Sequence, residues 1–217
     1  MATIAPASAP PSTFPLWRRD VTGGSGPAGA TLAHLRRVTR PAHDRLEGAL
    51  GLTDDLDIDS YRKVLGRFYG FWVGWQPQVA VLLQDEALLQ PRRRLHLLAA
   101  DLAALGVSPQ ARDALPVCPL VPLRDGVEAL GSVYVLEGSS LGGRVIERNV
   151  ERCLASTGGK SCTYFRGYGA ETGAMWRALL LRLDAVPAAH IERVGRGAVA
   201  TFERMGSWLT SPQAGTP

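Results

Sequence analysis

Three residues near the start of the chain have types and spacing suited to binding a metal-containing ligand. His43 is followed four positions later by Glu47 and preceded seven positions earlier by Arg36, in the segment LRRVTRPAHDRLE. On a helix these spacings place the three side chains on nearly the same face. An imidazole that ligates a metal commonly donates its other N–H to a carboxylate, and a guanidinium binds carboxylates through paired hydrogen bonds. A solvated His–Glu pair beside a plain surface arginine would have the same spacing, so both interpretations stay open.

The segment YVLEGSSLGGRVI, residues 134–146, contains the pattern G-x-S-x-G centred on Ser140, and the β-rich run SVYVL leads into it. That is the outward form of a nucleophile elbow in a serine hydrolase. Such an enzyme needs a sheet and a downstream acid and histidine, yet the only histidine after Ser140 is His190, with Asp184 six residues before it. Helical spacings of three and four residues continue through the segment at Val127, Leu130, Tyr134, Gly138, Leu141 and Val145. We therefore favour a helix over the elbow.

If residues 134–146 are helical, their small side chains need an explanation. Gly138 and Gly142 lie on one face at i and i+4, with Ser139 and Gly143 beside them, so they leave a bare ledge about one turn long. Each interior glycine costs a helix about 1 kcal/mol relative to alanine. Two features could offset that cost: a closely crossing helix, or a planar ligand that lies against the backbone. The segment alone does not decide between them.

Helical spacing recurs along most of the chain, and almost no segment alternates apolar and polar residues with a period of two. We therefore predict an all-α fold, a single-domain helical bundle. The predicted helices lie at 32–50, 53–83, 92–106, 108–116, 124–157, 170–186 and 187–209, with a loop at 158–169. Pro41 either kinks the first of these helices or begins its second half, because proline removes one donor and crowds the preceding turn.

The two ends of the chain differ from its middle. Residues 1–28 are rich in Pro, Ala, Ser, Thr and Gly without any period, which predicts a disordered arm. The folded domain is expected at 29–210 and a flexible tail at 211–217. The arm lacks the basic start and apolar core of a signal peptide, and the 3 cysteines form no C-x-x-C pair. Export, a disulfide framework and a zinc site are therefore not indicated, and we expect a cytoplasmic protein.

Charge and hydropathy argue against two classes of partner. The net charge is only +4, and the arginines are scattered along predicted helices rather than interleaved with aromatic residues. Nucleic-acid binding is therefore not expected. No apolar stretch approaches the roughly 20 residues that a bilayer-spanning helix needs, so we expect no membrane partner.

Together, the two motifs resemble the haem (heme) oxygenase family, in particular the bacterial biliverdin-producing forms that supply bilin to bacteriophytochromes. LRRVTRPAHDRLE is similar to the family's proximal helix, and YVLEGSSLGGRVI is similar to its distal helix. TYFRGYG and TFERMGSWL resemble later family segments, so the similarity runs from about Leu32 to Leu209. The resemblance implies a haem that lies between a proximal helix and a glycine-kinked distal helix.

The resemblance implies roles for residues on the proximal side. His43 matches the axial ligand of the haem iron, and Glu47 matches the acid that orients it. Arg36 and Tyr134 match a cationic residue and a tyrosine near the haem propionates. Arg177, on the helix MWRALLLRL, is a second candidate for a propionate, although an exposed helical arginine would have the same sequence context.

On the distal side, Gly138, Gly142 and Gly143 match the kink over the haem. Many animal members carry an Asp directly after the first of these glycines, and this chain has Ser139 there. Similar bacterial forms also lack that Asp, so the departure concerns the proton route, for which we expect water positioned by Gly138 and Ser139. Phe202, on the last predicted helix, is a candidate for the pocket wall, with core packing as the alternative.

The implied activity is the ring opening of haem b, with O₂ and external electrons, to biliverdin, Fe²⁺ and CO. The haem would be both substrate and cofactor, bound non-covalently because the chain has no C-x-x-C-H. No dinucleotide, flavin or iron–sulfur pattern is present, so a ferredoxin, flavodoxin or NADPH-dependent reductase would supply electrons. The bilin would pass to a bacteriophytochrome. A non-catalytic haem carrier or sensor that uses His43 is the alternative.

Overall fold

The computed structural model describes residues 27–50, 57–153 and 162–211, and the regular elements within these ranges are all helices, which confirms the predicted all-α class. The longer helices are α1 (Pro27–Leu50), α2 (Ile58–Leu83), α4 (Leu95–Ala104), α5 (Pro109–Asp113), α6 (Gly126–Cys153), α8 (Thr172–Asp184) and α9 (Ile191–Thr210). Shorter pieces are α3 (Glu86–Leu89), η1 (Gln90–Arg92), α7 (Thr163–Arg166), η3 (Gly169–Glu171) and η4 (Ala188–His190). Apart from Pro27, Ala28 and Ser211, the predicted arm and tail lie outside these ranges. None of the described helices is long and apolar enough to cross a membrane.

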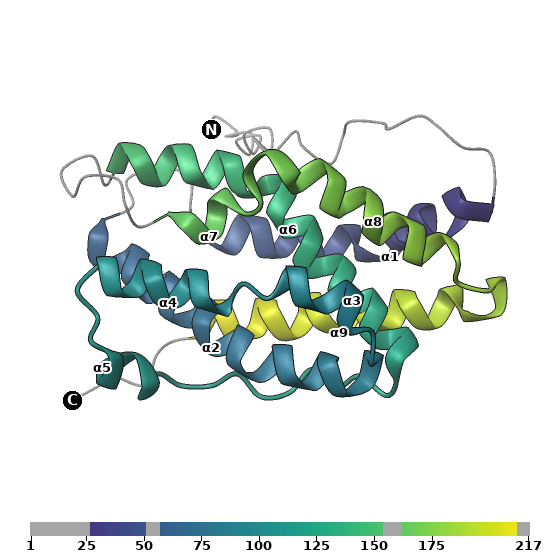
Figure 1. Ribbon diagram of the computed structural model, residues 1–217, viewed down its shortest axis with the longest axis horizontal. Helices are drawn as coiled ribbons and strands as arrows, with labels where there is room; N and C mark the ends of the chain where they lie inside the picture. The colour runs from purple at the N-terminus through teal and green to yellow at the C-terminus, as the bar shows by residue number, and fades with distance from the viewer. Residues whose placement is uncertain (1–26, 51–56, 154–161, 212–217) are drawn as a thin grey trace, which may run out of the picture.

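The helix α9 packs against three of the other long helices, α6, α1 and α2. Both α6 and α1 contact it extensively, while α8 packs on α1, and α2 packs against α4 and α6. In Figure 1, α9 runs along the long axis of the molecule, with α1 and α8 on one side of it and α2 on the other. This arrangement holds the two helices that carry the candidate site, α1 and α6, against a common support.

Local sequence explains where several helices begin and end. Asp57 caps α2, since its carboxylate accepts a hydrogen bond from the backbone N–H of Ser60 at 2.8 Å. Gln84 ends the same helix in the left-handed conformation, at φ 51°. Pro41 lies inside α1, which continues as one helix on both sides of it.

Glycines allow α6 and α9 to cross closely. A Cβ on Gly131 would lie 1.9 Å from the carbonyl oxygen of Val194, and a Cβ on Gly197 would lie 2.0 Å from that of Glu128. Both distances are far below van der Waals contact, so only glycine fits at either position. Close helix crossing, one of the two explanations for a small-residue surface on α6, therefore applies to its first half. Further along, α6 changes direction (Figure 1).

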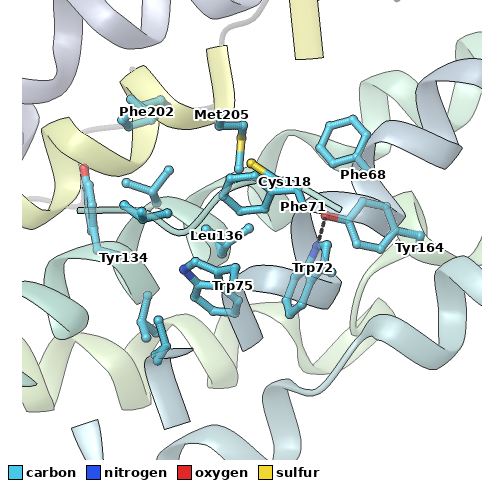
Figure 2. Close-up of a cluster of buried hydrophobic side chains, with 14 of the residues drawn as sticks. Phe68, Phe71, Trp72, Trp75, Cys118, Tyr134, Leu136, Tyr164, Phe202 and Met205 are labelled. Atoms are coloured by element: carbon cyan, nitrogen blue, oxygen red, sulfur yellow. Dashed lines mark hydrogen bonds between the residues drawn. The ribbon is translucent and has the colours of Figure 1, made fainter. Parts of the chain in front are cut away.

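The core between α2, α6 and α9 is aromatic, and its polar atoms are paired. The indole N–H of Trp72 donates to the hydroxyl of Tyr164 at 2.8 Å, and Figure 2 shows the two side chains meeting there. The indole N–H of Trp75 donates to Ser132 at 2.7 Å, and the hydroxyl of Thr201 lies 2.7 Å from that of Ser132. The two hydrogen bonds at Ser132 fix how α2, α6 and α9 pack against one another, and the bond to Tyr164 ties α2 to α7.

The structure differs from the prediction at 158–169, where a loop was expected and α7 forms instead. The cause is Asp101 on α4, whose side chain is fully buried. Its carboxylate accepts from the backbone N–H groups of Thr163 and Tyr164, each at 2.9 Å, and from the hydroxyl of Thr163 at 2.5 Å. A distant carboxylate thus caps the N-terminus of α7 and lets a short helix form.

Candidate functional site

His43 lies on α1 with its ring turned toward α9. The ring meets Phe202 edge-on, with centroids 5.9 Å apart, and Phe202 itself is buried. Burial lowers the pKa of His43 below its ordinary value, because a charged imidazole is poorly solvated there; its contact with Asp44 acts in the opposite direction. The imidazole is therefore neutral at pH 7, which is the form that ligates a metal.

Among the described residues, Asp44 is an acid that contacts His43. Its carboxylate oxygen lies 3.2 Å from Nδ1 of His43, and its second oxygen accepts from Nε of Arg40 at 3.0 Å. Sequence spacing predicted Glu47 for this role, and the side chain of Glu47 lies outside the residues that the structure describes. The signal that was missed is the i, i+4 pair of Arg40 and Asp44, which holds the carboxylate beside the imidazole.

Tyr134 lies between α6 and α1, and its side chain is buried. Burial raises the pKa of its phenol, while the nearby charge of Arg36 and a hydrogen bond with Thr39 lower it. Its ring also packs against Trp176 of α8, with centroids 5.7 Å apart. The charge of Arg36 therefore acts on Tyr134. Sequence reasoning placed both residues near the propionates, and that role stays a prediction.

The helices α1 and α6 both pack along α9, but they are not among the helix pairs that pack extensively on each other. The side chain of Tyr134 on α6 interacts with that of Thr39 on α1. His43 lies four residues after Thr39, Gly138 lies four residues after Tyr134, and both helices run in the same direction in Figure 1. We therefore expect the imidazole of His43 and the buried Gly138 to face a common space between α1 and α6.

The predicted ledge is described only in part. Gly142 and Gly143 lie within the helical span of α6, in the stretch 141–149 whose surroundings are outside the described residues. Ser139 is half-buried, and its hydroxyl donates to the carbonyl of Leu136 at 2.6 Å. That hydrogen is used within the helix, so the lone pairs of the Ser139 oxygen remain to accept a hydrogen bond.

A nucleophile elbow at Ser140 is excluded. The pattern G-x-S-x-G lies within α6, not at a turn between a strand and a helix. The Ser140 side chain is buried, and its oxygen accepts a hydrogen bond from Arg94. A guanidinium stays protonated and cannot serve as the general base that a serine nucleophile needs.

The side chain of Arg177 points away from Tyr134. It is exposed on α8, one residue after Trp176, and its guanidinium lies 3.4 Å from where a Cβ on Gly173 would be. The side chain therefore turns back along its own helix. Its assignment to a propionate stays a prediction.

Sequence reasoning missed a buried polar cluster beside the glycine segment, which we call the flank cluster: Arg92, Arg94, Glu137, Ser140 and Tyr168. The run RRR at 92–94 has the composition of a solvated surface. The charged residue at position 137, in a helix of mostly apolar and small residues, was the signal that could have indicated a buried partner.

Comparison with known proteins identifies the family of the chain. A model of the heme oxygenase family matches residues 30–211, which is most of the chain. The chain is also 37% identical, over 102 residues, to a protein named heme oxygenase from Xanthomonas campestris pv. campestris (strain 8004). That match covers 45% of this chain and 56% of the relative, so it spans little more than half of the relative's length. On the extent of the family match, the chain belongs to the heme oxygenase family.

Proposed function

We propose that this protein is a haem oxygenase, which opens the ring of haem with O₂ and external electrons to give biliverdin, Fe²⁺ and CO. The observation that carries the proposal is the half-buried His43, whose pKa is lowered by burial, on α1 of a chain that belongs to this family. The alternative within the same fold is a carrier or sensor that binds haem through His43 and releases it unchanged.

The residues present fit haem. His43 offers a neutral imidazole, and Arg36 and Tyr134 lie together on facing helices, where a cation and a phenol suit the propionate carboxylates. The edge of Phe202 supplies an apolar wall beside the imidazole. When bound, haem supplies the iron that activates O₂ and is itself the molecule that is oxidised.

On the proximal side, the chain's own groups hold and orient the substrate. His43 would ligate the iron, and Asp44 would accept the hydrogen on Nδ1 and so keep the ring in one tautomer. Glu47 is kept as a further candidate for this role. Arg36 and Tyr134 would fix the propionates and thereby select the ring edge that turns toward the distal helix.

On the distal side, the chain leaves space where a side chain would otherwise stand. Gly138 has no Cβ, and Gly142 and Gly143 extend the same helix, so water can lie against the backbone. Ser139 carries no carboxylic acid, and its oxygen can accept a hydrogen bond from that water. We infer that protons reach the site through water that Gly138 and Ser139 position.

The electrons must come from another protein, and α1 offers a surface for it. Arg36, Arg37 and Arg40 are exposed on α1, near His43 in the sequence. Such a basic surface would steer an acidic donor, and a ferredoxin, a flavodoxin or an NADPH-dependent reductase are the candidates. We further propose that the bilin product supplies a bacteriophytochrome in the cytoplasm.

The test is product analysis. Protein mixed with equimolar haem is given ascorbate or a reductase system in air, and biliverdin is separated by chromatography while CO is trapped and counted. Equal amounts of biliverdin and CO would support the oxygenase. Haem recovered intact would favour the carrier, and a failure to bind haem would contradict both proposals.

A further inference from the structure

The flank cluster is built from elements that are far apart in sequence. Arg92, Arg94, Glu137 and Ser140 are at most 5% exposed, so each charge in the cluster has been removed from water. Removing charges from water is costly unless they are paired and hydrogen-bonded. Apolar side chains of similar size could fill the same space without the cost of burying charges. We therefore look for a specific role for this cluster.

Glu137 is held from two sides. One carboxylate oxygen lies 3.2 Å from Nε of Arg92, and the other accepts from the hydroxyl of Tyr168 at 2.5 Å. Arg92 is itself fixed, because its two terminal nitrogens donate to the carbonyls of Leu88 and Met175, each at 2.7 Å. Arg92 therefore ties α6 to both α3 and α8.

Ser140 is held by a second arginine. Arg94 donates to its hydroxyl through one terminal nitrogen and to the carbonyl of Tyr164 through the other, at 2.6 Å. The guanidinium also lies 4.5 Å from the ring centroid of Tyr164 and 5.4 Å from that of Tyr168. These rings favour a cation over their faces and keep Arg94 in place.

The two residues that the arginines hold lie beside the turn of α6 that is proposed to face the haem. Glu137 and Ser140 are three residues apart on one side of α6, and Gly138 and Ser139 lie between them in sequence. Glycines weaken a helix locally, so this turn of α6 has little stiffness of its own. The contacts of the flank cluster hold this turn in place and so offset the loss of stiffness at the glycines.

We propose that Glu137 is a positioning residue for haem turnover, which holds the turn of α6 at Gly138 and Ser139 at a fixed distance from the haem through Arg92 and Tyr168. The proposal rests on the proposed function. It assigns Glu137 no contact with haem or with O₂. Its effect is on how the distal backbone and its water are placed, where a displacement of about 1 Å can cost on the order of 100-fold in rate.

The test variant is Glu137→Gln, which keeps the shape and one acceptor but removes the charge that pairs with Arg92. Truncation to alanine is avoided, because a cavity of about 230 Å³ already adjoins Glu137 and Arg92 and would admit water. Glu128→Gln is the matched control. Glu128 is on the same helix, is equally buried and contacts Arg196 at 3.4 Å, but lies ten residues before Gly138.

Three measurements are made on wild type and both variants: hydrogen exchange of the backbone amides at 138–143 in the haem-free protein, kcat with KM for haem, and the ratio of biliverdin isomers. For Glu137→Gln we expect faster amide exchange, a kcat lower on the order of 10- to 100-fold with KM little changed, and a mixture of isomers. Glu128→Gln should change none of the three.

A purely structural role would lower thermal stability without altering the kcat of the folded protein or its isomer ratio. Wild-type kcat and isomer ratio in Glu137→Gln would therefore overturn the proposal, and so would equal changes in Glu128→Gln. A wild type that binds haem without turnover would contradict the proposed function instead. The amide exchange of the haem-free variants would still decide whether Glu137 holds the turn.

Discussion

Gly197→Ala perturbs the crossing that places α6 against α9. A Cβ at this position would lie 2.0 Å from the carbonyl oxygen of Glu128 and 2.7 Å from its Cα. Carbon atoms in contact are about 3.5–4.0 Å apart, so the two helices would have to separate by roughly 1 Å. Overpacking of this kind costs about 1–3 kcal/mol. Alanine gains roughly 1 kcal/mol over glycine in helix propensity, so the net loss is up to about 2 kcal/mol.

The assay is thermal unfolding of the haem-free protein, followed by haem titration. For a chain of this length, each kcal/mol changes Tm by about 2–4 °C, so we expect Tm to fall by up to roughly 8 °C. Haem affinity should fall as well, because α9 carries Phe202 against His43. The matched control is Gly206→Ala on the same helix, where an added Cβ would meet nothing within 4 Å and should raise Tm slightly. Equal Tm shifts in the two variants would refute the reasoning.

Three further predictions concern single residues. Asp101→Asn places an N–H donor opposite a backbone N–H at the start of α7, so the free energy of unfolding in urea should fall by about 1–3 kcal/mol; an unchanged midpoint would contradict the capping role. Burial raises the pKa of the Cys118 thiol to about 11, so only on the order of one thiol in a thousand is ionised at pH 8. Mass spectrometry should show Cys118 unalkylated at that pH until the protein unfolds. Gly138→Ala should stabilise α6 by about 0.5–1 kcal/mol while slowing haem turnover, and unchanged turnover would count against the role of the bare backbone.

The helical course of α6 could be predicted from the sequence because its spacing continues through the glycines. Val127, Leu130 and Tyr134 set the register, and a strand and turn at Ser140 would have broken it. A common role for Arg36 and Tyr134 was predicted from the resemblance alone, since the two residues are on different helices and nothing local connects them.

The parts that could not be predicted depend on partners far away in the chain. The helix α7 forms because Asp101, 62 residues before Thr163, caps it. The sequence around Arg92 and Arg94 is typical of a solvated surface, yet both side chains are buried. They are buried because Arg92 contacts Glu137 and Arg94 donates to Ser140, both on α6. Local composition does not reveal such contacts, since a charged residue enters a core only where the fold supplies its partner.

The contact between His43 and Asp44 was missed for a geometric reason. Spacing of four residues favoured Glu47, whose side chain lies outside the described residues and whose role stays a prediction. The contact that the structure describes is with the adjacent Asp44, which Arg40 holds in place. Neighbours in sequence seldom face each other on a helix. Here the carboxylate reaches the imidazole because a second ion pair directs it.

The central claim is that haem is opened while His43 ligates its iron, and haem titration of four samples tests it most directly: wild type, His34→Ala as a control histidine on the same helix, and His43→Gly with and without imidazole. After equimolar haem, each receives ascorbate in air and is followed by absorbance. Wild type and His34→Ala should lose the Soret band as a broad red bilin band grows. His43→Gly should keep its Soret band, and imidazole should restore the conversion. Bilin formation by His43→Gly without imidazole, or a Soret band that persists in wild type, would contradict the central claim.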